Sequence, residues 1–173
     1  AKIGPNRGLV VVLGVPGGDP TQTADAAGDG MMLYVQCPDA DSAAAVRKAA
    51  EKAGGLGERG FVEQAPASRI LLAGNLADAV ILTDGARGVT RDEAMRVLRP
   101  GGRLAAIRGA KVLVKPAPAG TDDWSHPYHG PDNNPQSADR LAKAPYLTHF
   151  LARPMFSSQP EVTVAAGGRI FKA

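Results

Sequence analysis

The sequence predicts an α/β protein with a doubly wound, mostly parallel sheet of about five strands, followed by a proline-rich junction and a β-hairpin. Three observations support this. Short β-branched runs alternate with helical segments over the first 115 residues, eight of the 14 prolines lie from Pro116 onward, and the last residues alternate apolar and polar around a glycine pair. Strands that alternate with helices imply right-handed crossovers and therefore parallel pairing.

Five short apolar runs are the predicted strands of this sheet. The first and fourth of them are apolar on both faces, which is the pattern of a buried parallel strand. The runs cover residues 8–14, 32–37, 59–64, 77–84 and 103–109.

Two segments between these runs predict helices. Residues 41–55 are rich in alanine, with Asp41 as the expected N-cap and Gly54 or Gly55 as the stop. Residues 90–98 open with a capping box in which Thr90 is the cap and Glu93 lies three residues on.

A change in composition near residue 116 divides the chain. "KPAPAG", residues 115–120, reads as an extended boundary because proline fixes φ and disfavours helix at the preceding residue. We therefore expect an α/β domain over residues 1–115, a junction over 116–143 and a strand segment over 144–173.

The loops that follow the first two strands are candidates for nucleotide binding. In doubly wound sheets, ligands bind beyond the carboxyl ends of the strands, where the strand order reverses. The first strand runs into "GVPGGDP", where Gly14, Gly17 and Gly18 allow a ligand to approach the backbone closely. The second runs into "CPDAD", where Asp39 or Asp41 could accept hydrogen bonds from ribose hydroxyls or cap the next helix.

The junction holds the only tryptophan and two of the three histidines, within "DDWSHPYHGPDNNPQSAD". His126, His129 and Asp132 could bind zinc, iron or copper. The alternative is a folded loop in which polar side chains satisfy backbone groups and Trp124 and Tyr128 pack beneath them.

The tail has strand character. Residues 144–156 fit an edge strand or an extended arm, and "PEVTVAAGGRIFKA", residues 160–173, reads as a hairpin with its turn at the glycine pair. A lone hairpin is unstable in water. We therefore expect residues 144–173 to pack against another part of the protein or another chain.

Composition excludes some classes of protein. A formal charge of +3 does not require a nucleic-acid partner, and no apolar run is long enough for a membrane-spanning helix. One cysteine, Cys37, rules out an internal disulfide framework, and the first residues lack the basic-then-apolar pattern expected of a signal peptide. A basic series is expected to be a solvated face, or alternatively a polyanion surface; it comprises Arg87, Arg91, Arg96, Arg99, Arg103, Arg108, Lys111 and Lys115.

The stretch "DAVILTDG…TRDEAMRVLRPGGRLAAI" resembles the fourth strand, helix and fifth strand of class I S-adenosylmethionine-dependent methyltransferases, with a strand that ends in Asp84. This resemblance implies a Rossmann-like domain with Gly14, Gly17, Gly18, Asp39 and Asp84 as cofactor-binding residues. Two features depart from the family. "GVPGGD" replaces the usual glycine pattern, and no sixth and seventh strands follow to complete the substrate side.

The order of segments resembles secreted bacterial proteins, frequent in planctomycetes, that join a methyltransferase-like domain to a pyrroloquinoline-quinone-type β-propeller. The resemblance rests on the "KPxPxxxDxWxHxxHxxxNN" pattern of the junction and on "GRIF" in the tail. It implies that the hairpin begins the first propeller blade, and that the protein is periplasmic or extracellular. Pyrroloquinoline quinone would be a cofactor only of a complete propeller.

These observations favour a non-catalytic methyltransferase-like module of such a propeller protein, with a binding or structural role. Its partner would be the remainder of a propeller, or another chain that packs on residues 144–173. One alternative is an S-adenosylmethionine-dependent methyltransferase. A second alternative is a metal-binding protein that uses the His126 and His129 loop.

Overall fold

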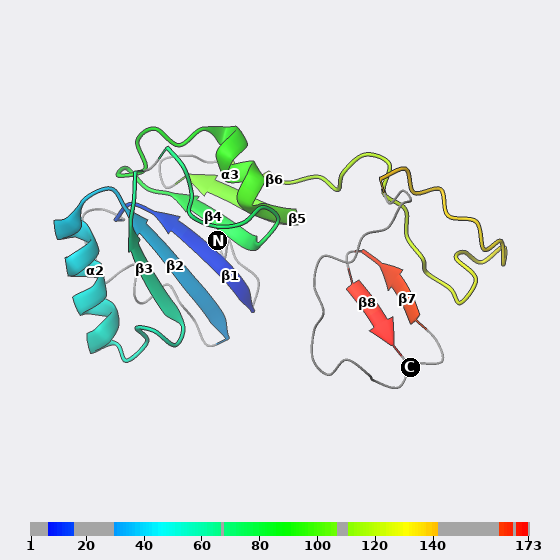
Figure 1. The fold of residues 1–173 in the computed structure, drawn as a ribbon, viewed down its shortest axis with the longest axis horizontal. Helices are drawn as coiled ribbons and strands as arrows, with labels where there is room; N and C mark the ends of the chain where they lie inside the picture. Colours follow the sequence, from blue (N-terminus) through cyan, green and yellow to red (C-terminus); the bar gives the residue numbers. More distant parts are fainter. Residues whose placement is uncertain are drawn as a thin grey trace. The chain divides into compact units, whose positions relative to one another are not determined.

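A computed structural model gives the architecture, and it describes residues 7–15, 30–66, 68–106, 111–141, 163–167 and 169–172. The chain forms two compact units, residues 1–116 and 117–173, which are described separately. The first contains a six-stranded sheet in the order β3-β2-β1-β4-β5-β6 (Figure 1). Its strands are β1 (Gly8–Leu13), β2 (Met31–Cys37), β3 (Gly60–Gln64), β4 (Ala77–Leu82), β5 (Leu98–Ala106) and β6 (Leu113–Val114).

The first five strands are parallel, and only β6 is antiparallel to its neighbour, β5. The doubly wound, mostly parallel sheet expected from the sequence is therefore present. The short sixth strand was not expected, because the "KVLV" run before the proline-rich junction is too brief to show a clear period. The residues described include no helix long and apolar enough to cross a membrane.

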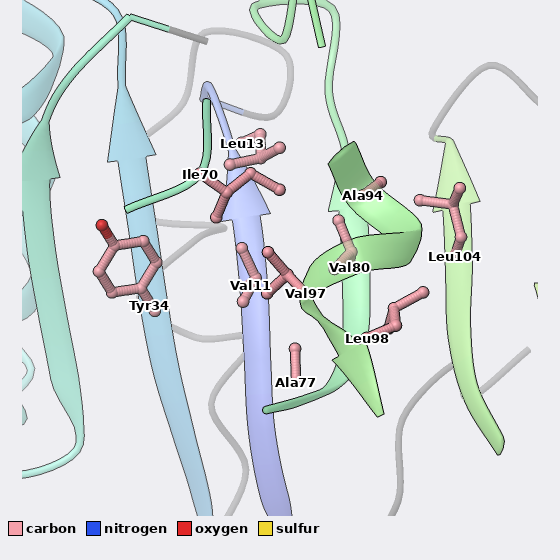
Figure 2. Close-up of a cluster of buried hydrophobic side chains, with 10 residues drawn as sticks. All are labelled: Val11, Leu13, Tyr34, Ile70, Ala77, Val80, Ala94, Val97, Leu98 and Leu104. Carbon is pink, nitrogen blue, oxygen red and sulfur yellow. The ribbon is translucent and has the colours of Figure 1, made fainter. Parts of the chain in front are cut away.

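The two faces of the sheet are covered by the two described helices, α2 (Ala40–Lys52) and α3 (Arg91–Val97). Val11 and Leu13 of β1 belong to one buried cluster with Val97 of α3, as Figure 2 shows. Val10 and Val12 belong to a second cluster with α2. Alternate residues of one strand thus enter different cores, which explains why β1 is apolar throughout.

The helix ends agree with the sequence at Thr90 and Gly54 and differ at the N-cap of α2. Thr90 is the N-cap of α3, with its side chain accepting from the Glu93 amide, and Gly54, at φ 71°, follows the end of α2. The N-cap of α2, however, is Asp39, and Asp41 lies in the first helical turn. Asp39 accepts from both the amide and the hydroxyl of Ser42, so the helix begins two residues earlier than expected.

Polar side chains hold the connection between β3 and β4, which contains no helix over its described residues. The side-chain amide of Gln36 donates to the carbonyls of Pro66 and Arg69 and accepts from the Leu71 amide. From α3, Glu93 accepts from the Ile70 amide at 2.8 Å and Arg96 donates to the carbonyls of Ile70 and Leu72. Side-chain hydrogen bonds thus satisfy backbone amides and carbonyls of this connection, which in a helix would bond to each other.

The outer edge of β3 is protected against pairing with another strand. The Gly60 amide donates to Gly55, the Gly60 carbonyl accepts from Gly57, and Arg47 of α2 donates to the Val62 carbonyl at 2.9 Å. Edge strands are open templates for association unless their backbone groups are covered. This edge is therefore a poor site for strand addition.

The second unit contains a hairpin of β7 (Thr163–Ala166) and β8 (Arg169–Lys172), antiparallel and joined at the expected glycine turn (Figure 1). Trp124 of the junction pairs with Ala165 through two reciprocal backbone hydrogen bonds of 2.6 Å. The junction and the hairpin therefore belong to one body. The two-stranded sheet does not show that the hairpin begins a propeller, and the strand expected over 144–156 lies outside the described residues.

Candidate functional site

The strand order of the sheet reverses between β1 and β4. From β1 the chain continues to β2 on one side, whereas β4 adjoins β1 on the other. This is the switch point at which ligands bind in doubly wound sheets, outside the carboxyl ends of the strands. The residues that follow β1, β2 and β4 therefore form the candidate site.

Thr83 ties the carboxyl ends of β1 and β4 together. Its hydroxyl donates to the Leu13 carbonyl at 2.7 Å and accepts from the Gly85 amide at 3.2 Å, while its own amide donates to the same Leu13 carbonyl. The side chain is almost completely buried. Thr83 therefore fixes the base of the candidate site and is not itself available to a ligand.

Gly14 lies directly above this base. It is buried, its φ is 79°, and a Cβ added there would lie 2.5 Å from the Thr83 hydroxyl and 2.8 Å from the Gly85 backbone. A side chain would thus clash with atoms that cannot move away easily. The close approach that Gly14 permits is to the protein's own β4 turn. Gly17 and Gly18 lie outside the described residues.

Two exposed carboxylates flank the end of β1. Asp39 follows β2 and Asp84 follows β4, and these two strands are the neighbours of β1 on either side. Hydrogen bonds from the amide and then the hydroxyl of Ser42 lower the pKa of Asp39 below its usual range, so it is ionised at neutral pH. The rim of the site therefore carries acceptor groups and negative charge on both sides.

Gln36 is a residue of this region that the sequence did not single out. It is 2% exposed at the carboxyl end of β2, and its carbonyl accepts from the Gly14 amide at 2.8 Å. Its side chain also holds the start of the β3–β4 connection, as described above. The sequence does mark this residue, because Gln36 is the one amide side chain in the otherwise apolar run "MLYVQC". A polar side chain buried in a strand requires hydrogen-bond partners.

Cys37, next to Gln36, is completely buried, and burial raises the pKa of its thiol. A protonated, inaccessible thiol is a poor nucleophile and a poor metal ligand. Cys37 therefore contributes packing at this edge of the sheet.

The junction histidines face different partners. The Nε2 atom of His129 lies 2.7 Å from a carboxylate oxygen of Asp122, whereas Nδ1 of His126 lies 2.9 Å from the Ser125 hydroxyl. Their backbones pair across a tight turn, and the Trp124 ring packs edge-on against His129 with 5.3 Å between ring centroids. Hydrogen bonds from the Ala138 amide and then from His129 lower the pKa of Asp122.

Because an ionised carboxylate only accepts, Nε2 of His129 carries a proton. Its Nδ1 is buried and has no partner among the described residues. A metal-bound histidine has this arrangement, with its other nitrogen bonded to a carboxylate. However, the described part of the chain contains no group of three metal-ligating side chains, and the Asp132 carboxylate accepts from the Asn134 amide. Metal binding by His126, His129 and Asp132 stays a prediction.

Residues of the basic series bond to different groups of the protein. Arg99 bonds to Asp78, Arg96 pairs with Glu93, and Lys115 donates to Asn75 and to the Leu98 carbonyl. Arg108 lies outside the described residues. Three of these cations therefore bond to protein groups, and polyanion binding by the series stays a prediction.

No protein-family model and no curated protein matches the sequence. Solved structures do match its fold. Geranyl diphosphate methyltransferase in complex with SAM (S-adenosylmethionine) gives a TM-score of 0.50 at 17% identity, over 61% of this chain and 44% of that protein. A SAM-dependent methyltransferase from Aquifex aeolicus gives 0.47 at 14% identity, over 64% and 65%. The YcgJ protein from Bacillus subtilis gives 0.48 at 17% identity, over 57% and 43%.

The first unit therefore has a methyltransferase-like Rossmann fold. The chain spans less than two thirds of the length of each of these three proteins. At such low identity the similarity concerns the fold alone, and fold does not determine activity.

Proposed function

We propose that the first unit binds S-adenosylmethionine at the carboxyl edge of its sheet. One observation carries the proposal. At the switch point beside β4, the exposed carboxylates of Asp39 and Asp84 flank the end of β1. In Rossmann-like folds an acidic residue near the end of the second strand accepts hydrogen bonds from ribose hydroxyls. Asp39 has this position.

The chemistry of the rim suits this ligand. Each oxygen of Asp39 accepts one hydrogen bond from Ser42, and a carboxylate can accept about four in all. It can therefore accept from a ribose while it continues to cap α2. Two carboxylates favour a ligand with cationic groups over a phosphorylated nucleotide. When bound, S-adenosylmethionine would supply an electrophilic methyl group on a sulfonium.

A second candidate function is a non-catalytic module within a larger protein with a propeller. One observation favours it. Gly14 is buried and packs against the Gly85 backbone, so the close approach that it permits is to the protein itself. In this proposal the β7–β8 hairpin begins a quinoprotein-like propeller, and the protein is periplasmic or extracellular. The first unit then has a structural or binding role.

Calorimetric titration with S-adenosylmethionine and S-adenosylhomocysteine separates the two candidates. The informative variant is Asp39→Ser, because serine still caps a helix but has no carboxylate for a ribose. Asp41→Asn is the matched control, since Asp41 is a neighbouring exposed acid in the first turn of α2.

The proposal expects binding in the micromolar range, at least about tenfold weaker in Asp39→Ser, because hydrogen bonds to a charged group contribute about 1.5–3 kcal/mol. Asp41→Asn should bind like the unmodified chain. Absence of binding to the folded, unmodified chain would support the non-catalytic module instead.

A further inference from the structure

Among the described residues, one edge of strand β8 has no backbone partner. Ala165 directs both its amide and its carbonyl to Trp124, so β7 bonds to β8 through Val164 and Ala166, which lie opposite Phe171 and Arg169. Partners alternate along antiparallel strands. The amides and carbonyls of Ile170 and Lys172 therefore point away from β7, and no described residue pairs with that side of β8.

The opposite edge of the hairpin is already covered. Trp124 pairs with β7, and the Asp123 carboxylate accepts from the Gly167 amide in the turn at 3.2 Å. These contacts come from consecutive junction residues, which fix the hairpin on its β7 side. Of the two strands of this hairpin, β8 is therefore the one whose outer edge has no backbone partner among the described residues.

The composition of β8 indicates what kind of strand would pair with it. Ile170 is 67% exposed and Phe171 is 55% exposed, and they lie on opposite faces of the hairpin because side chains alternate along a strand. Two basic residues, Arg169 and Lys172, occupy the ends of the strand. A complementary strand has apolar residues opposite the central pair and acidic residues opposite the ends.

A second copy of this chain fits poorly at the same edge. In an antiparallel pair the outward-pointing residues face each other, so Ile170 of one copy would lie opposite Ile170 or Lys172 of the other. Each β8 strand has two basic residues and no acidic one, so such a pair brings four cations together without any cross-strand ion pair. The charge pattern therefore favours a different strand over self-association.

We propose that the β8 edge binds an extended strand of a partner protein segment in which two adjacent apolar residues are flanked by acidic residues. The main-chain hydrogen bonds of Ile170 and Lys172 supply the affinity, and the charges at Arg169 and Lys172 supply the selectivity. This proposal is independent of ligand binding by the first unit.

The test uses the full chain and two synthetic peptides with blocked ends, Thr-Glu-Val-Val-Glu-Thr and Thr-Lys-Val-Val-Lys-Thr. Both sequences are palindromic, so each can pair in either direction. Binding is followed by nuclear magnetic resonance titration, and hydrogen exchange of the Ile170 amide reports pairing at the edge directly. The variant Ile170→Pro removes an outward-pointing donor without removing a hydrogen bond to β7.

The glutamate peptide should bind at least about fivefold more tightly than the lysine peptide at low salt, with a smaller difference at high salt. It should slow exchange of the Ile170 amide, and Ile170→Pro should weaken binding about threefold to tenfold. Equal binding of the two peptides would overturn the proposal. Slow exchange of the Ile170 amide in the dilute free chain, or self-association of the chain through β8, would overturn it as well.

Discussion

Removing the carboxylate of Glu93 should destabilise the first unit by breaking the contact between α3 and the β3–β4 connection. Glu93 pairs with Arg96 through both oxygens, at 2.8 Å each, and accepts from the Ile70 amide. Its side chain is 16% exposed, and Ile70 is 1% exposed. The hydrogen bonds of Arg96 are the main reason that the pKa of Glu93 falls from 4.5 to about 2.

Two variants separate the charge from the hydrogen bond. A fall of that size in the pKa corresponds to a contribution to stability of about 3 kcal/mol at most. Because Arg96 is partly exposed and solvent screens its pairing, we expect Glu93→Gln to lower the free energy of unfolding by about 1–2 kcal/mol. Glu93→Ala also leaves the Ile70 amide without an acceptor, so we expect a loss of about 2–4 kcal/mol. The control is Asp92→Asn, an exposed acid in the same turn, which should cost about 0.3–1 kcal/mol.

Urea unfolding at two pH values is the assay. The folded pKa of Glu93 is below its unfolded value, so its contribution is complete above about pH 4.5 and is lost as the pH falls toward 2. The difference between the unmodified chain and Glu93→Gln should therefore shrink by more than half between pH 7 and pH 3. If Glu93→Gln is no less stable than Asp92→Asn at pH 7, or if the difference does not depend on pH, the reasoning is wrong.

Three further predictions concern packing and the division of the chain. Gly14→Ala should lower the free energy of unfolding in urea by about 3 kcal/mol or more, whereas Gly54→Ala should lower it by only about 1 kcal/mol. Both glycines have positive φ, but only Gly14 lacks room for a Cβ. Equal losses in the two variants would contradict this. Gln36→Leu should lower the free energy of unfolding by about 2–4 kcal/mol, because it leaves the Leu71 amide and the carbonyls of Pro66 and Arg69 unpaired. A loss below about 0.5 kcal/mol would show that water replaces these hydrogen bonds. A chain that ends at Pro116 should keep a cooperative thermal transition, within about 4–8 °C of the corresponding transition of the full chain, by circular dichroism; loss of that transition would show that the second unit is part of the first core.

The strands could be predicted from the sequence because parallel strands buried on both faces leave a simple pattern. Val10 to Leu13 face two cores in alternation, so the run is apolar without interruption. The hairpin was equally visible, because its turn falls at Gly167 between alternating residues. These features depend on neighbours within a few positions along the chain.

The polar contacts across the fold could not be predicted in this way. The pairing of Glu93 with Ile70 joins residues 23 positions apart, and the capping box at Thr90 suggested that Glu93 would instead fold back on its own helix. Asp39 and Asp41 were both plausible caps for α2, and only the backbone geometry distinguishes them. At the candidate site, the sequence located the acids after β2 and β4 but not the burial of Gly14 beneath the β4 turn.

The most direct test of the proposed ligand site is to map amide chemical shifts of the full chain during a titration with S-adenosylhomocysteine. The proposal predicts saturable shifts concentrated at the carboxyl ends of β1, β2 and β4, including Val15, Asp39 and Asp84. The amides of the junction and of the β7–β8 hairpin should not change. No saturable shift at these strand ends, or shifts confined to the junction, would contradict the proposal.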